Sequence, residues 1–143
     1  MFLVRCTLVL LLASTVVASD AVPDWALEGI LSVESASYYE AAPGTRIVYV
    51  DKRIGAAGER GPFQMTRIAF DQIARSGESF TRLGTDTRYA EGKARAYLLW
   101  LYEGPAQKNW ERAIGMYNTG PTGYYRNRST ASRYTRSVKL ASG

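Results

Sequence analysis

The sequence predicts a single, mainly helical domain with a short β element, and three observations support this. The chain has 143 residues, a length typical of one domain. Apolar side chains recur at helical spacing in five segments after residue 20. Residues 45–51 (TRIVYVD) instead alternate and are rich in β-branched side chains, which predicts a short strand.

The first expected helix covers residues 24–39, with Pro23 or Asp24 near its start. The predicted strand follows a loop that contains Pro43 and Gly44. Residues 52–61 (KRIGAAGERG) carry three glycines, so we expect irregular backbone there.

The four later helices are expected at residues 62–76, 86–103, 110–117 and 130–140. The second helix would start at Pro62, a favoured first helical residue, and end before Gly77. The third would stop before Gly104, and the short fourth would end in the sequence 118–121 (NTGP). The apolar stripe of the third helix is Ala90, Ala94, Tyr97, Leu98 and Leu101.

Residues 1–19 have the pattern of a secretory signal peptide. They contain one arginine, an apolar run at 7–17 and small residues at the end. The run is shorter than the roughly 20 residues that a membrane-spanning helix needs. We therefore expect an exported domain at residues 20–143, periplasmic or extracellular, with no stable membrane insertion once the signal is removed. Retention of the segment as an anchor stays open.

Cysteine and histidine usage excludes several chemistries. The single cysteine, Cys6, lies in the signal segment, so the mature domain would have no disulfide. The chain has no histidine, which removes histidine-based triads and the usual catalytic zinc sites. Acid–base chemistry must come from carboxylates, tyrosine or lysine, and we expect no metal and no cofactor.

The whole chain has a net charge of +5. The positive charge is concentrated in its last third. No acidic residue follows Glu111, whereas six basic residues do: Arg112, Arg126, Arg128, Arg133, Arg136 and Lys139. Such a surface suits an anionic partner, although a merely solvated basic face explains it equally well. No nucleic-acid-binding motif is recognisable, so we expect no nucleic-acid partner.

Glu34 interrupts the apolar stripe of the first helix. The stripe positions are Leu27, Ile30, Leu31, Glu34 and Tyr38. A carboxylate on an apolar face loses hydration, which favours its protonated form. Glu34 could then hold a proton near neutral pH and donate it to a leaving group. The alternative is a side chain that reaches water or a basic residue elsewhere.

Gln64 lies in the glycine-rich segment 58–65 (GERGPFQM). With Gly61 as N-cap, Gln64 would be the third helical residue, and its amide would reach back to the cap. The functional alternative is an amide that faces a cleft.

Tyr117 and Asn118 lie in the segment 113–121 (AIGMYNTGP). Asparagine is common at helix ends because it tolerates left-handed backbone. Tyr117 would either pack in the core with its hydroxyl at the surface or line a cleft.

In this order, the segments resemble the catalytic domain of soluble lytic transglycosylases and goose-type lysozymes. The three motifs read Glu34-Ser35, the run 61–65 (GPFQM) and the run 117–120 (YNTG). The run 94–101 fits the helix that the family places between the second and third motifs. The resemblance covers about residues 24–140, and the order and spacing of the motifs make it specific.

The resemblance implies an α+β lysozyme-like fold with a cleft for peptidoglycan glycan strands, and we expect a monomer. Glu34 would protonate the glycosidic oxygen and then act as base, while the muramic acid's own hydroxyl closes a 1,6-anhydro ring. The implied substrate-binding residues are Ser35, Gln64, Met65, Tyr117 and Asn118.

Departures from the family pattern keep two alternatives open. The chain has Pro-Phe-Gln at 62–64 where the family commonly has Leu-Met-Gln, and Met116 where alanine is usual. A muramidase would use a second carboxylate about 6.5–9.5 Å from the acid to activate water. Asp51 and Glu59 are the candidates, although both also read as ordinary loop charges. A non-catalytic wall-binding domain is the other alternative.

Overall fold

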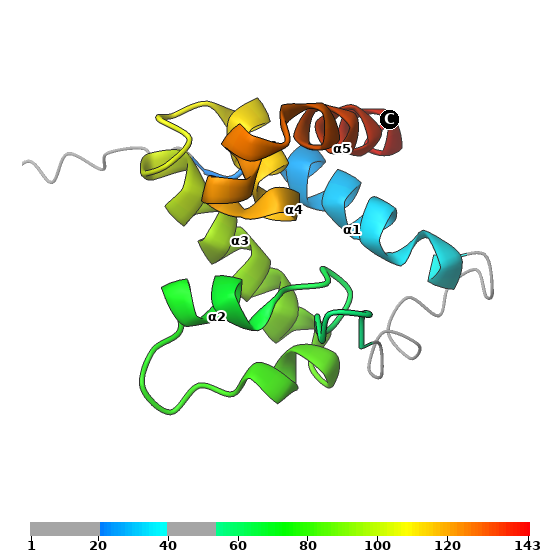
Figure 1. The fold of residues 1–143 in the computed structure, drawn as a ribbon. Coiled ribbons are helices and arrows are strands. Elements are labelled where there is room, and N and C mark those ends of the chain that lie inside the picture. The colour runs from blue at the N-terminus through cyan, green and yellow to red at the C-terminus, as the bar shows by residue number, and fades with distance from the viewer. Residues whose placement is uncertain (1–20, 40–53) are drawn as a thin grey trace, which may run out of the picture.

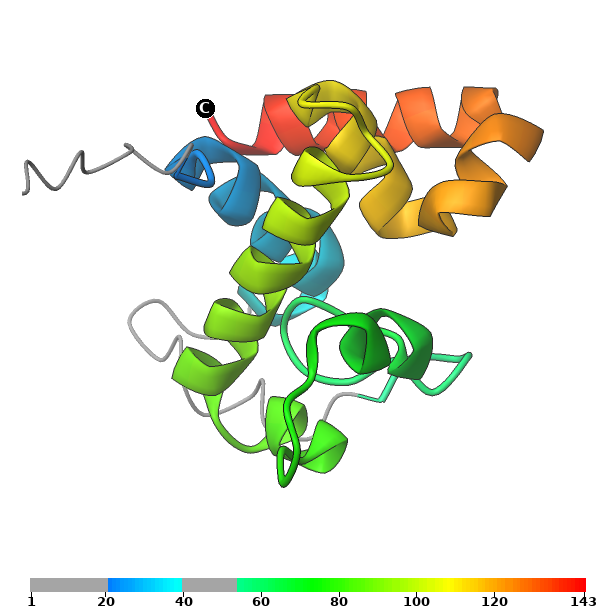
Figure 2. The ribbon, with the colours of Figure 1, turned by 90° about the vertical axis from the view of Figure 1, so that its left-hand side faces the viewer.

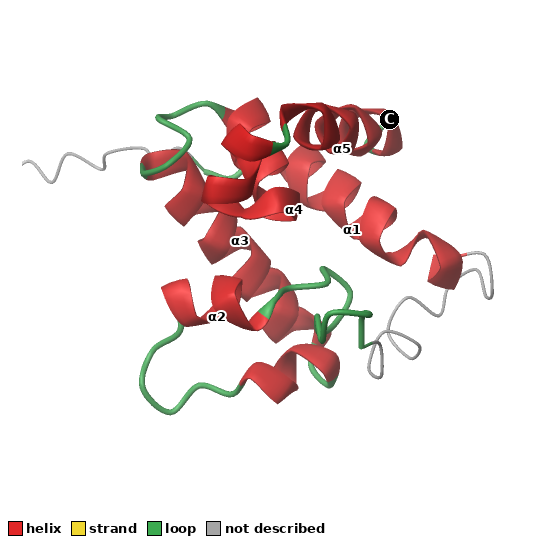
Figure 3. Cartoon of the chain, in the orientation of Figure 1, coloured by secondary structure: helices red, strands yellow, loops and turns green. Residues whose placement is uncertain are grey.

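The computed structural model describes residues 21–39 and 54–143, and the side chains of 36–39 lie outside this description. The described part is mainly helical (Figure 3). Its elements are α1 (Asp24–Tyr39), α2 (Arg67–Ile73), the 3-10 helix η2 (Phe80–Gly84), α3 (Thr87–Glu103), α4 (Trp110–Arg126) and α5 (Arg128–Ala141). The prediction of a mainly helical domain is therefore confirmed.

The helices form two groups that α3 connects. Helix α5 packs on both α1 and α4, while α2 and η2 pack on α3. Figures 1 and 2 show α3 running from the α2 end of the molecule to the end where α4 and α5 lie. The loop at residues 54–66 precedes α2 directly in the chain and lies beside it (Figure 1).

Helix α1 has the predicted bounds and crosses α5 very closely. Gly29 faces the backbone of Val138, because a Cβ atom on Gly29 would lie 2.3 Å from the Val138 carbonyl oxygen. Further along α1, Glu34 meets Tyr134, which precedes Val138 on α5. The two helices therefore run antiparallel past each other.

Helix α3 also matches its prediction. Its N-cap is Asp86, whose side chain accepts a hydrogen bond from the backbone N–H of Tyr89 at 2.9 Å. It ends before Gly104, as expected. All five residues of the predicted stripe are buried, which confirms the helical face read from the sequence.

The second helix was predicted wrongly. It begins at Arg67 rather than Pro62, and Thr66 caps it by accepting a hydrogen bond from the Ala69 N–H at 3.1 Å. The backbone at Gly61 (φ 74°) and Gln64 (φ 45°) is left-handed, which a right-handed helix cannot contain. Gln64 is therefore part of a turn and is not the third residue of a helix. The short helix η2 was not predicted.

The fourth helix is longer than predicted. Helix α4 continues to Arg126, with a kink at Gly120 (φ 72°, ψ 162°). The predicted break at 118–121 is therefore present, but the helical turns after it were missed. Pro121 opens this second segment, where its missing N–H costs no hydrogen bond.

The last helix starts at Arg128, two residues earlier than expected, because Asn127 acts as N-cap for Thr130. The predicted strand at 45–51 lies outside the described residues. In the described loop, pairing is limited to isolated antiparallel bridges, Ile54 with Arg60 and Arg60 with Met65.

Candidate functional site

One hollow collects most of the residues that the motifs singled out. It has a volume of about 210 Å³. Its lining residues are Glu34, Gly55, Ala56, Glu59, Gln64, Thr66, Tyr117 and Asn118. They come from α1, from the loop before α2 and from the first half of α4. Three segments far apart in the sequence therefore meet here, and each of the three motifs contributes.

Glu34 is half-buried at this hollow. The hydroxyl of Tyr134 on α5 donates a hydrogen bond to its Oε1 at 2.7 Å. This donor is a phenol, which the sequence did not predict as a partner of Glu34. This hydrogen bond restricts the orientation of the carboxylate.

Tyr134 contacts Glu34 directly, although the sequence motifs did not place it in the site. It lies with Ala131 and Val138 on the buried face of α5. From its place in the sequence it is therefore expected to be an ordinary core residue. The available signal was the hydroxyl itself, since a buried tyrosine usually needs a hydrogen-bond partner.

Tyr117 connects α4 to the turn at residues 61–64. Its hydroxyl donates to the backbone oxygen of Phe63 at 2.9 Å. Its ring packs at a tilt against Tyr97 on α3, with the ring centroids 5.6 Å apart. Tyr117 thus lines the hollow and also holds the loop in place.

Gln64 and Glu59 approach each other across Gly55. The Gln64 amide nitrogen donates to the Gly61 oxygen at 2.8 Å. A Cβ atom on Gly55 would lie 2.6 Å from Gln64 Oε1 and 2.1 Å from Glu59 Oε2. The same Glu59 oxygen accepts a hydrogen bond from the Ala57 N–H at 3.0 Å. A side chain at position 55 would therefore displace the ends of Glu59 and Gln64 from their present positions.

Two residues expected to bind substrate are interior instead. Ser35 is 1% exposed and donates a hydrogen bond to the Pro62 oxygen at 2.6 Å, while Met65 is 2% exposed. Ser35 ties the loop to α1 and Met65 belongs to the hydrophobic core, and neither lines the hollow. Asn118 is exposed at its rim, and Asp51 lies outside the described residues.

Burial strongly affects the phenols near Glu34. It raises the pKa of Tyr134 and of Tyr117 well above the ordinary value of 10, and the charge of Glu34 adds to both shifts. Burial also raises the pKa of Tyr97 to about 12. These phenols therefore stay protonated at neutral pH and act as hydrogen-bond donors rather than as bases.

Alkaline titration should reveal these three tyrosines. A tyrosine whose pKa is higher in the folded state leaves stability unchanged below pH 10, where both states are protonated. Above pH 10 the unfolded state loses its proton first, so stability falls as the pH rises. We expect the 295 nm absorbance of Tyr97, Tyr117 and Tyr134 to develop only together with loss of the helical circular dichroism. Titration of all ten tyrosines near pH 10 with the helices intact would contradict this.

A functional interpretation of the chain rests on the residues of this hollow. Comparison with protein-family models, with curated proteins and with solved structures gave no match. The resemblance read from the motifs therefore remains a hypothesis about function.

The described residues, 21–39 and 54–143, contain no group of three or more histidine, cysteine, aspartate or glutamate side chains placed to hold a metal ion. Among them, no helix has the length and apolar character needed to cross a membrane.

Proposed function

We propose that this chain is an exported peptidoglycan lytic transglycosylase with a lysozyme-like fold and Glu34 as its single catalytic carboxylate. The observation that carries the proposal is the meeting of Glu34, Gln64, Tyr117 and Asn118 at one hollow. Each of the three motifs of the resemblance contributes at least one of these residues.

The chemistry needs one group that first gives and then takes a proton. Protonated Glu34 donates to the oxygen of the β-1,4 bond that follows the muramic acid, and the bond from C1 to that oxygen breaks. The 6-hydroxyl of the same muramic acid attacks C1 and passes its proton to Glu34. The products are a 1,6-anhydro ring and a new sugar hydroxyl, and no water is consumed.

The neighbouring side chains support this cycle. Tyr134 holds one oxygen of Glu34 at 2.7 Å, which restricts the carboxylate to one orientation. The amides of Gln64 and Asn118 face the hollow and would hydrogen-bond the sugar. Tyr117 and Ser35 keep the 61–64 turn against α4 and α1, so the wall of the site stays fixed.

The test is mass spectrometry of muropeptides released from purified peptidoglycan by the chain without residues 1–19. Products that end in 1,6-anhydromuramic acid, absent with Glu34→Gln, would support the proposal. Release of nothing from any wall would favour a non-catalytic wall-binding domain instead.

A muramidase is the second candidate, because Glu59 lines the same hollow as Glu34. In that case Glu59 would activate water, and the products would carry reducing ends.

Glu59→Gln separates the two reactions. A transglycosylase should keep activity within about threefold, because no water needs activation. A hydrolase should lose roughly 100-fold or more, the usual contribution of a general base. The measurement is the rate of glycan cleavage together with the ratio of anhydro to reducing ends. A large loss in Glu59→Gln would overturn the single-carboxylate mechanism.

A further inference from the structure

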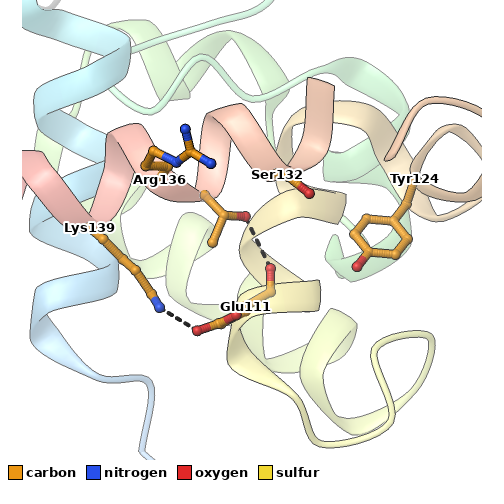
Figure 4. A pocket seen from close by; sticks show the side chains of 6 residues that line it. Glu111, Tyr124, Ser132, Arg136 and Lys139 are labelled. Atoms are coloured by element: carbon orange, nitrogen blue, oxygen red, sulfur yellow. Dashed lines mark hydrogen bonds and ion pairs between the residues drawn. The ribbon is translucent and has the colours of Figure 1, made fainter. Parts of the chain in front are cut away.

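A second hollow lies between α4 and α5 (Figure 4). Its volume is about 260 Å³. Its lining residues are Glu111, Tyr124, Ser132, Thr135, Arg136 and Lys139. Glu111 and Tyr124 belong to α4, and the other four belong to α5. None of them lines the hollow at Glu34.

The α5 side of this hollow is a row of polar and cationic residues. Arg128, Ser132, Arg136 and Lys139 are spaced four, four and three residues apart, which places them on one side of a helix. The row spans about 16 Å at the rise of an α-helix. Arg128 does not line the hollow itself. Its guanidinium carbon lies 5.9 Å from the ring centroid of Tyr124, which does.

The stability of α5 explains Lys139, which lies in the last turn and pairs with Glu111, but it does not explain the two arginines. Arg128 is the first residue of the helix, where the helix dipole disfavours a cation. Arg136 and Lys139 are three residues apart, so they repel each other. Among the described residues, neither Arg128 nor Arg136 has a carboxylate within ion-pair distance, whereas Arg82 is paired with Asp86 at 2.7 Å. Two guanidinium groups are therefore available to an external anion.

The hollow is nevertheless not purely basic. Lys139 forms an ion pair with Glu111 (Figure 4), and the Glu111 side chain is 64% exposed. A nucleic acid strand, with a charge about every 3.4 Å, would place phosphates next to this carboxylate. A short peptide has few carboxylates, and neutral amides separate them. The Glu111 carboxylate can accept a hydrogen bond from the N–H of such an amide. The mixed charge favours the peptide.

We propose that this hollow binds a short acidic peptide through one of its free carboxylates. The Arg136 guanidinium would hold that carboxylate with two parallel hydrogen bonds. The hydroxyls of Ser132 and Tyr124 would bind amide groups, and Glu111 would accept an N–H. This inference rests on the proposed function, because peptidoglycan carries short acidic peptides on its muramic acid units. The enzyme would then hold the wall at two places, by glycan and by peptide.

The test is an NMR titration of the purified chain with the N-acetylated tripeptide Ala–γ-Glu–Ala, which has two free carboxylates and no cation. We expect shifts in the amide signals around Tyr124, Ser132 and Arg136, and none with an analogue whose carboxylates are carboxamides. Arg136→Gln should weaken the affinity about tenfold or more, because it removes a charge-assisted pair of hydrogen bonds. Arg133→Gln is the matched control, since Arg133 is exposed on α5 but does not line the hollow, and it should bind normally.

The outcomes separate this inference from the proposed function. A chain that cleaves glycan but shows no peptide shifts, or that binds the carboxamide analogue equally well, overturns the inference alone. Equal weakening by both arginine variants also overturns it, since it would show a diffuse charge effect. If a single-stranded oligonucleotide shifts the same signals with steep salt dependence and displaces the peptide, the hollow is a polyanion site. Peptide binding without any glycan cleavage overturns only the proposed function.

Discussion

Glu34→Gln is expected to lower glycan cleavage by about 1,000-fold or more, because this residue both donates and accepts the proton. Glutamine keeps the size of the side chain and can still meet the Tyr134 hydroxyl, so the fold should survive. The measurements are the initial rate of muropeptide release and the helical circular dichroism. Unchanged dichroism with lost activity would assign the effect to chemistry.

Two variants serve as controls for Glu34. Glu28→Gln removes a carboxylate from the exposed face of the same helix and should keep normal activity. Tyr134→Phe removes only the hydrogen bond to Oε1 and should cost about tenfold, as expected for a hydrogen bond to a charged group. Activity of Glu34→Gln within tenfold of the unmodified chain would rule out Glu34 as the acid.

Gly29→Ala is expected to lower the free energy of unfolding by about 1–2 kcal/mol. Alanine by itself favours a helix by about 1 kcal/mol, but overpacking costs about 1–3 kcal/mol and sometimes more. The clash prevails here because the added Cβ would lie 2.3 Å from a backbone oxygen of Val138, which cannot rotate aside. Since α1 and α5 would move apart, the bond between Tyr134 and Glu34 would lengthen and activity would fall as well.

Gly92→Ala is the matched control. Gly92 lies inside α3, and a Cβ there would meet nothing within 4 Å. The helix preference then acts alone, so stability should rise by about 0.5–1 kcal/mol. Thermal unfolding of both variants should show shifts of opposite sign. Stabilisation by Gly29→Ala would mean that the helices are not in such close contact.

Local patterns predicted the elements whose signals agree with each other. Helix α1 and helix α3 each have an apolar stripe of helical period and a capping or first-turn residue that supports the start. The predicted start of α2 was wrong because Pro62 is a good first helical residue only when the backbone after it is right-handed. Gln64 at φ 45° breaks that condition, and no feature of the Gln64 side chain reveals it. The helical turns after Gly120 were missed because NTGP reads as an end of helix.

The candidate site was predictable in composition but not in detail. The break in the apolar stripe singled out Glu34, and the order of the motifs singled out Gln64, Tyr117 and Asn118. The role of Ser35 was not predictable, because only tertiary packing places it under the Pro62 oxygen. The contact from Tyr134 has the same origin, since residues so distant in sequence carry no local signal for each other.

The hydrogen bond from Tyr134 to Glu34 joins positions 100 residues apart, and this has a consequence for how the chain matures. A contact between residues so far apart in sequence forms late. Closing a loop of that length costs about 4 kcal/mol in chain entropy before any packing contact offsets it. During synthesis, α1 therefore emerges long before α5 can dock on it. Under the proposed function, the carboxylate gains its oriented geometry only when that docking is complete. Under the same proposal, an incompletely folded chain would not cleave peptidoglycan, whereas the folded chain would.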